Sequence, residues 1–166
     1  MRELQPGLWH WQAPHPDWTP DEPWPQEVSS YAIDDGARLL LFDPQSVPNE
    51  ILELAADREP VIVLTVPWHE RDTRSLVERL DAPVFTPPPD TADDLVLWIE
   101  SRHAVVLGDT LVDFGDGFEI NKRLRGGVTR EQVVERLRPL LDLPVDLVLP
   151  AHGEPTNSAT LERALS

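Results

Sequence analysis

The sequence lacks cysteine, has a single lysine and contains no long apolar run. The absence of cysteine excludes disulfides, iron–sulfur clusters, thiolate metal sites and a cysteine nucleophile. Any metal ion must therefore be held by His, Asp or Glu. No run approaches the roughly 18 apolar residues of a membrane helix, and the first residues show no apolar segment after a basic one. We expect a cytoplasmic protein with no membrane association.

Positive charge is also scarce. Lys and Arg total 14 against 30 Asp and Glu, which gives a formal net charge of −16. Such an excess repels phosphate backbones, so we do not expect a nucleic-acid partner. Apolar residues make up 40% of the 166 residues, enough for a packed core. We predict one domain over residues 1–166.

Tryptophan and proline are concentrated near the N-terminus, between Trp9 and Pro25. Proline at this density excludes a helix and favours an extended or turning path, while the indole rings provide area to bury on a neighbouring surface. We predict that this stretch forms a lid, as part of an N-terminal segment 1–28 that packs on the rest of the domain.

The remaining chain alternates strand and helix signals. Apolar runs predict strands at 30–33, 38–42, 61–64, 83–85, 95–99, 104–107 and 146–149. The pair Asp35-Gly36 predicts a hairpin between the first two. Helices are expected after Pro48, near Asp72 or Thr73, after Thr129 and at the C-terminal end through 161–165. Thr129 and Gln132 have the spacing of a capping box. Sheets interleaved with amphipathic helices indicate a layered α/β or α+β fold.

Three polar clusters follow directly after predicted strands. They are the segments 68–72, 108–110 and 151–153. Strand ends can aim side chains from distant parts of a chain at one point, and ligands collect there in layered α/β folds. Imidazole and carboxylate groups suit Zn²⁺, Fe or Mn²⁺. We therefore expect the three clusters to form one common site, where any metal ion is held by His and carboxylate side chains.

Five segments resemble, in order and spacing, the motifs of the metallo-β-lactamase-fold hydrolases, which include glyoxalase II-like thioesterases and lactonases. The family motifs are an Asp after an early strand, T-H-x-H-x-D-H, T-P-G-H-T-x-G, G-D-T-L-F and P-x-H-G. The matching segments are 41–43, 64–72, 85–91, 108–111 and 150–153. The resemblance implies a four-layer αββα sandwich of the metallo-β-lactamase type. It also implies metal-dependent hydrolysis of an ester, thioester or lactone.

The match to T-H-x-H-x-D-H leaves two registers open. If His69 is the second motif histidine, Pro67 stands at the first, Arg71 at the aspartate and Asp72 at the third. If Arg71-Asp72 matches x-D instead, Thr73 stands at the final histidine and His69 is one residue out of phase. In both registers the first of the family's two metal positions lacks ligands, which points to a single-metal site.

The resemblance implies specific roles for the residues that remain. The predicted ligands of one divalent Zn, Fe or Mn ion are Asp72, Asp109, His152 and His69. Asp109 and His69 are also predicted to be catalytic. Asp43 and Asp90 are expected to contact the ligand side chains without binding the ion themselves. Asp90 is also the nearest substitute for the histidine that is missing from the middle motif.

A second reading accompanies each of these assignments. Asp72 precedes a helix, where an aspartate can cap backbone N–H groups with no metal present. His69 could instead be a packed, hydrogen-bonded histidine. We expect the other histidines, at 10, 15 and 103, to be structural or exposed.

Substrate contacts are predicted at Trp68, which adjoins His69, and in the basic segment 122–125. This segment contains Lys122, Arg123 and Arg125. It is either an anion-recognising loop or a solvated loop on an acidic protein. We also predict that one of Trp11, Trp18 and Trp24 packs near the cleft formed by Trp68 and His152.

Two functions are consistent with these features. One is a hydrolase with an altered, mononuclear metal site that acts on a small molecule. The other is a metal-free, non-catalytic relative that uses the same cleft to bind a small molecule or another protein. The sequence leaves the substrate, the metal and the oligomeric state open.

Overall fold

The larger of two facing sheets holds the N-terminal half of the chain. A computed structural model describes residues 1–88 and 94–166; Asp90, a predicted site residue, lies outside them. The sheet has six strands in the order β1-β2-β3-β4-β5-β6. They are β1 (Arg2–Gln5), β2 (Leu8–Pro14), β3 (Glu27–Asp34), β4 (Arg38–Phe42), β5 (Glu59–Val63) and β6 (Val84–Phe85). Strands β1 to β4 are antiparallel, whereas β4, β5 and β6 run parallel.

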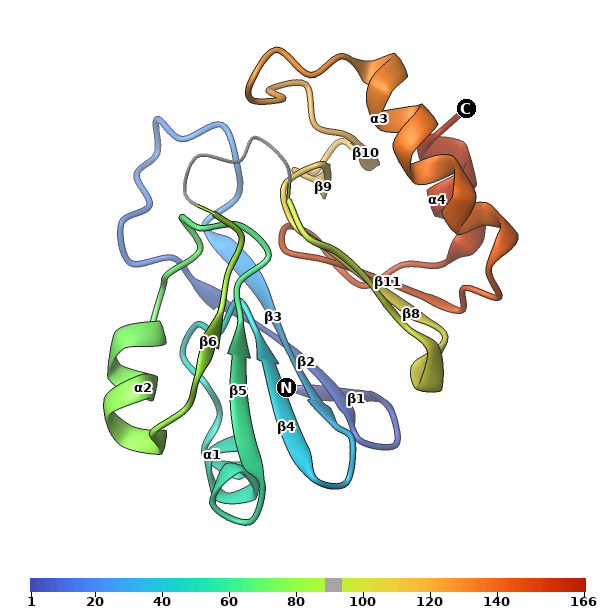
Figure 1. Ribbon diagram of the computed structural model, residues 1–166. Helices are drawn as coiled ribbons and strands as arrows, with labels where there is room; N and C mark the ends of the chain where they lie inside the picture. Colours follow the sequence, from blue (N-terminus) through green and yellow to red (C-terminus); the bar gives the residue numbers. More distant parts are fainter. Residues whose placement is uncertain (89–93) are drawn as a thin grey trace.

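The smaller sheet holds the C-terminal half, in the order β11-β8-β7. Its strands are β7 (Val96–Ile99), β8 (Ala104–Leu107) and β11 (Leu147–Pro150). A separate hairpin joins β9 (Leu111–Asp113) and β10 (Phe118–Ile120). Helices α1 (Asn49–Ala56) and α2 (Thr73–Leu80) accompany the larger sheet, and α3 (Arg130–Leu137) and α4 (Ser158–Ala164) accompany the smaller one (Figure 1). Short 3₁₀ turns lie at η1 (Glu100–Arg102) and η2 (Arg138–Asp142).

Three separate hydrophobic clusters define the layers. Because side chains alternate along a strand, β8 sends Val105 and Leu107 toward α3 and α4, and Ala104 and Val106 toward the other sheet. In β4, Leu39 and Leu41 likewise pack with α1 and α2, whereas Phe42 faces the smaller sheet. The order of layers is therefore helices, sheet, sheet, helices, which confirms the predicted αββα fold class.

Local signals in the sequence correspond to most of these elements. The predicted hairpin is formed by β3 and β4 around Asp35-Gly36. Thr129 and Gln132 make both hydrogen bonds of a capping box at the start of α3. Helix α3 ends at Leu137, because Pro139 lies in the 3₁₀ turn η2 that follows. None of the helices in the described part of the chain is long and apolar enough to cross a membrane.

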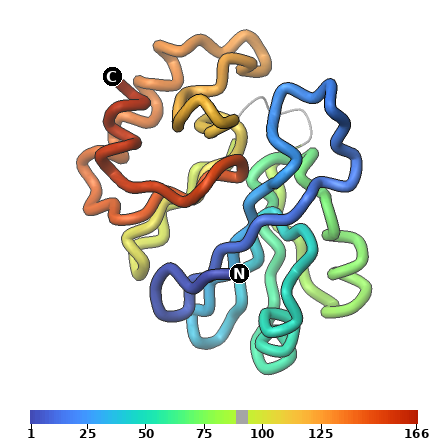
Figure 2. The backbone as a smooth tube through the Cα atoms, turned by 180° about the vertical axis from the view of Figure 1, so that it is seen from behind, coloured from blue at the N-terminus to red at the C-terminus, as the bar shows by residue number. Residues whose placement is uncertain are grey.

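The N-terminal segment differs from its predicted role. Residues 8–14 form β2, an inner strand of the larger sheet that pairs with β1 and β3. Trp11 is buried in the core beneath α1, and its indole Nε1–H donates to the carbonyl of Gln45 at 2.7 Å. Pro14 is tolerated because it is the last residue of the strand. Within the tryptophan- and proline-rich stretch, residues 15–26 form a loop outside the sheet (Figure 2).

Candidate functional site

The site lies where four strands end. Asp43 follows β4 directly, His69 comes shortly after β5, Asp109 follows β8, and His152 follows β11. Since β4 and β5 are parallel, as are β8 and β11, each pair presents its carboxyl ends at one edge. The two sheets face each other, so the four side chains meet although they are distant in sequence.

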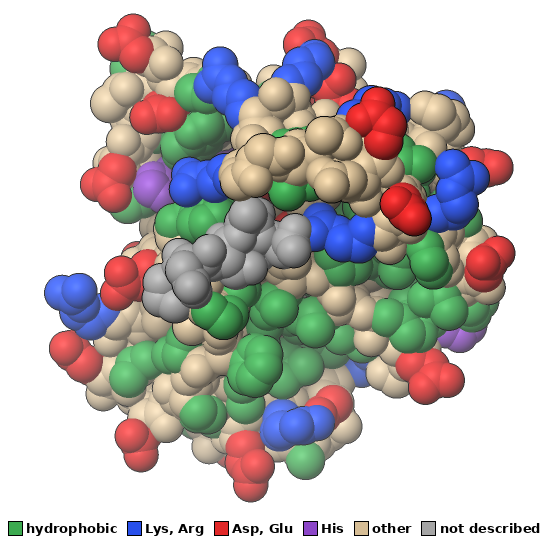
Figure 3. Space-filling model, turned by 45° about the horizontal axis from the view of Figure 1, so that its top comes forward, with side chains coloured by type: hydrophobic (Ala, Val, Ile, Leu, Met, Phe, Trp, Pro, Cys, Tyr) green, Lys and Arg blue, Asp and Glu red, His purple; other side chains and the backbone are tan. Residues whose placement is uncertain are grey.

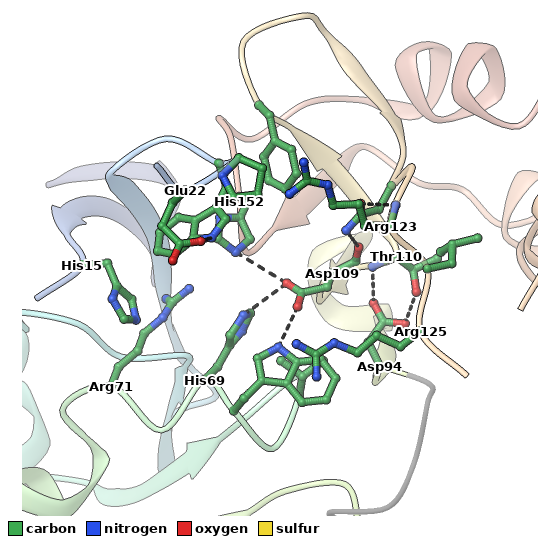
Figure 4. A pocket seen from close by; sticks show the side chains of 17 residues that line it. His15, Glu22, His69, Arg71, Asp94, Asp109, Thr110, Arg123, Arg125 and His152 are labelled. Atoms are coloured by element: carbon green, nitrogen blue, oxygen red, sulfur yellow. Dashed lines mark hydrogen bonds and ion pairs between the residues drawn. The ribbon is translucent and has the colours of Figure 1, made fainter. Parts of the chain in front are cut away.

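His69, Asp109 and His152 form a compact group (Figure 4). The His69 Nε2 atom is 3.1 Å from Asp109 Oδ1, and His152 Nε2 is 3.5 Å from the same oxygen. One ligand atom from each residue lies within 4.8 Å of the other two. Both imidazoles are buried. The convergence that the sequence predicts for these three side chains is therefore present.

Asp43 supports the group from outside. Its Oδ2 lies 3.0 Å from His69 Nδ1, and its Oδ1 accepts the backbone N–H of Thr65 at 2.8 Å. The Thr65 hydroxyl also donates to Oδ2. A histidine that ligates a metal through one nitrogen usually donates its other N–H to a carboxylate in this way. Asp43 thus leaves the Nε2 atom of His69 directed at Asp109.

The electrostatics of the metal-free group are strongly coupled. Burial disfavours a charged His69, but the negative charges of Asp43 and Asp109 outweigh burial and raise its pKa to about 9. Burial and the neighbouring charge of His69 lower the pKa of His152 to about 3. Although burial opposes ionisation of Asp109, the charge of His69 and the hydrogen bond from the Trp68 indole hold the pKa of Asp109 well below its usual range. His69 therefore carries a proton whose positive charge offsets one of the two negative charges of the carboxylates.

The donor set fits one divalent ion. Two imidazole nitrogens and a carboxylate oxygen are ligands suited to Zn²⁺, and the fourth ligand can be water or substrate. Asp109 Oδ1 is buried and makes no hydrogen bond of acceptable geometry among the described residues. An ion between the three atoms would supply the missing partner. Among residues 1–88 and 94–166 a second ion finds no comparable set, because the side chains of Pro67 and Arg71 offer no ligand atoms.

Asp72 is a correction to the predicted ligand set. Its Oδ2 accepts the backbone N–H of Ser46 at 2.6 Å, and it is not a member of the His69, Asp109 and His152 group. The residue occupies the N-cap position of α2, yet its side chain makes no capping hydrogen bond with that helix. Asp72 ties the loop after β4 to the start of α2 and does not reach the site.

Trp68 and the basic loop form one wall of the pocket. The Trp68 indole Nε1–H donates to Asp109 Oδ2 at 2.8 Å, and the Arg125 guanidinium carbon lies 3.9 Å from the ring centroid. Arg123 and Arg125 both line the pocket. Lys122 does not, contrary to its predicted substrate contact, because its ammonium is exposed and pairs with Glu119 at 2.7 Å.

Replacing Trp68 by Phe removes the hydrogen bond to Asp109 but keeps an aromatic ring. We expect zinc affinity to fall by about 10-fold to 100-fold, the range for losing an outer partner of a ligand. Thermal unfolding should change little, because Trp68 is only half-buried. Isothermal titration with Zn²⁺ measures the affinity, and Trp98→Phe in β7 is the matched control. Equal losses in both variants would mean that the indole N–H does not position Asp109.

Aromatic rings form the opposite wall. Trp24 and Phe114 lie edge-on to His152, at ring-centroid distances of 5.4 and 5.5 Å. Trp24 is thus the N-terminal tryptophan that packs near the cleft. His15, expected to be structural or exposed, also lines the pocket and lies 5.2 Å from the Trp24 ring. The pocket has a volume of about 460 Å³, which suits a small molecule.

Asp94 is a site residue that sequence reasoning missed. It is largely buried, lines the pocket, and accepts the Thr110 backbone N–H at 3.0 Å and the Thr110 hydroxyl. A Cβ atom on Gly108 would lie 2.8 Å from Asp94 Cβ, so only glycine allows this close approach. Asp94 therefore fixes the turn that presents Asp109. No local pattern indicates this, because Thr110 is distant in sequence.

Comparison with known families decides the relationship. The sequence model of the metallo-beta-lactamase superfamily matches residues 15–152. The chain belongs to the metallo-beta-lactamase superfamily. The matched range includes all four strand ends that build the site. No curated protein matches the chain significantly.

Solved structures share the fold at low sequence identity. The VMB-1 structure has a TM-score of 0.66 at 13% identity, covering 99% of this chain and 93% of its own. A metallo-beta-lactamase from Erythrobacter litoralis, with beta-mercaptoethanol in the active site, has a TM-score of 0.67 at 11% identity and the same coverage. DIM-1 metallo-beta-lactamase exposed to ceftazidime gives 0.64 at 10% identity, again covering 99% and 93%. These similarities concern the fold.

Proposed function

We propose that this superfamily member is a hydrolase with a mononuclear metal site that acts on an ester, thioester or lactone. The observation that supports the proposal best is the convergence of His69 Nε2, Asp109 Oδ1 and His152 Nε2 at the strand ends. A divalent ion bound there would polarise a carbonyl group and lower the pKa of a bound water toward neutrality. Zinc is the first candidate for such a donor set, and Fe and Mn are the others.

The protein's own residues would perform three tasks. His69, Asp109 and His152 would hold the ion, and Asp109 stays ionised because its pKa is strongly depressed. Asp43 would keep the His69 ring in the orientation that directs Nε2 toward Asp109. Trp24, Trp68 and Phe114 would exclude water from the reacting carbonyl. In this proposal Asp109 and His69 act as catalytic ligands, and the substrate is a small molecule.

One observation favours a second candidate, a metal-free binding protein. The positive charge of protonated His69 offsets one of the two negative charges of Asp43 and Asp109, so part of the charge that an ion would neutralise is already balanced. Such a protein would bind its small-molecule ligand in the same pocket and would not hydrolyse it. The two candidates differ in whether an ion displaces this proton.

Elemental analysis of protein purified without added metal or chelator tests the proposal. We expect about one equivalent of Zn, Fe or Mn per chain, and hydrolysis of a nitrophenyl ester, a thioester or a lactone that is lost after dialysis against a chelator. Adding back Zn²⁺ should restore the activity. Protein that contains no metal, and binds none on reconstitution, would establish the metal-free candidate instead.

A further inference from the structure

Arg71 places a fixed guanidinium in the pocket. It follows β5 in the left-handed region of backbone conformation, with φ of 39°. Its Nη1 donates to the carbonyl of Ser29 at 2.8 Å and to the carbonyl of Asp43 at 2.6 Å. These bonds hold the guanidinium in one orientation. In Figure 4, Arg71 and His15 lie on one side of His69, and Arg123 and Arg125 lie on the other.

The other edge of this guanidinium has no partner. Arg71 Nε and Nη2 are buried and make no hydrogen bond with the described residues. No carboxylate of the described chain forms an ion pair with Arg71. An unmet buried donor costs free energy, and the cost is larger when the group is charged. The Nε–H and Nη2–H pair is also the edge that binds carboxylate or phosphate oxygens in a bidentate manner.

Positive charge is scarce in this chain, and three arginines without a carboxylate partner among the described residues line the pocket. Acidic side chains are scattered over the visible surface (Figure 3), in keeping with the net charge of −16. Some other cations, such as Arg38 and Arg58, have carboxylate partners. In the described part of the chain Arg71, Arg123 and Arg125 form no such pair, although all three line the pocket.

None of the described carboxylates that line the pocket forms an ion pair with these three arginines. Asp109 is occupied by Trp68 and the two histidines. Asp94 is held by Thr110 and lies 3.6 Å from Arg136. Glu22 accepts the indole N–H of Trp24. The pocket therefore offers cationic groups on both sides of the His69, Asp109 and His152 group.

We propose that the ligand of this pocket carries a carboxylate or phosphate group and that Arg71 binds it. This inference rests on the proposed function, which makes the substrate an ester, thioester or lactone. It adds that the same substrate carries a negatively charged group. Arg123 and Arg125 lie at the mouth, where positive charge draws an anion into an otherwise acidic protein. Arg71 is then a specificity-determining residue that contacts the ligand.

Inorganic phosphate and acetate are the probes, titrated separately into chelator-treated protein at constant ionic strength. The change in tryptophan fluorescence reports binding, because Trp24 and Trp68 line the pocket. We expect saturable binding of at least one probe, weakened at least 10-fold in Arg71→Met. The control is Arg74→Gln, which removes an exposed guanidinium three residues away on α2. Binding that is equal in wild type and Arg71→Met, or absent from wild type, would overturn the proposal.

Arg71→Met also loses two structural hydrogen bonds, so its folding is checked by circular dichroism. If it does not fold, Arg71→Lys and a chemical-shift map of wild-type protein replace it. We expect phosphate or acetate to shift the amide resonances near Arg71, including those of Ser30 and Gln45, which follow the carbonyls that Arg71 binds. We also expect Arg71→Lys to bind the anion more weakly than the wild type. Shifts confined to residues 123–125 would contradict a role for Arg71.

The result is separable from the proposed function. Anion binding without bound metal or hydrolysis would refute the hydrolase and leave the role of Arg71 standing. Metal binding and hydrolysis of neutral esters, with no effect of Arg71→Met on anion affinity, would support the hydrolase and refute the role of Arg71. The phosphate and acetate arms distinguish which oxyanion the site prefers.

Discussion

Replacing Asp109 by Asn should abolish metal binding and hydrolysis while leaving the fold intact. The substitution keeps the size of the side chain but removes the negative charge that two histidines and an ion would share. We expect zinc affinity to fall more than about 100-fold, since loss of an outer partner alone costs 10-fold to 100-fold. Isothermal titration with Zn²⁺ and turnover of a nitrophenyl ester measure the two effects.

Asp72→Asn is the matched control for this prediction. Sequence reasoning placed Asp72 among the ligands, but its carboxylate binds the Ser46 backbone N–H, and an amide oxygen can still accept that bond. We expect its metal content and activity to equal those of the wild type. A loss of zinc from Asp72→Asn as large as that from Asp109→Asn would show that the ion is bound elsewhere.

Zinc affinity should rise by about tenfold for each pH unit between pH 6 and 8. His69 has a pKa of about 9 in the metal-free protein, raised by Asp43 and Asp109 against the effect of burial, so its Nε2 is protonated over this range. An ion must displace that proton, and the competing proton becomes scarcer as the pH rises. Above about pH 9 the affinity should level off.

The number of protons released tests the origin of this dependence. His152 has a pKa of about 3, so it is neutral at pH 6 to 8 and contributes no proton. Asp109 is already ionised. Titrations in buffers with different ionisation enthalpies should therefore report one proton released per zinc bound. A value near zero would mean that His69 is neutral before the ion arrives, and a value near two would implicate His152.

Sequence signals predicted the fold best where the physical cause is local. The Asp35-Gly36 turn and the Thr129 capping box each involve neighbours within a few residues, and both are present. The N-terminal strand was missed because tryptophans and prolines obscure its alternation. That residues 8–14 form a strand is evident only from their pairing with β3, in which Trp11 lies opposite Ser30. Such pairing depends on tertiary structure that composition does not encode.

The candidate site shows the same division. His69, Asp109 and His152 were found because each stands at a strand end within a motif. Asp72 was included because motif spacing alone does not show that its carboxylate turns toward Ser46. Asp94 was missed since its partner Thr110 is brought to it only by the fold. The unpaired edge of Arg71 depends on which carbonyls its Nη1 reaches, a fact of tertiary geometry.

The positions of the ligands have a consequence for a chain that has no disulfide. His69 lies in the loop after β5 of the larger sheet, whereas Asp109 and His152 follow β8 and β11 of the smaller one. An ion shared by the three would act as a reversible cross-link between the halves of the sandwich, added to bonds such as Tyr31 Oη to the Pro150 carbonyl. Unlike a disulfide, it is absent from the unfolded chain, so its contribution follows ion concentration. At 100 times the dissociation constant that contribution is about 2.7 kcal/mol, and the resistance of the two halves to separation would therefore follow the metal supply of the cell.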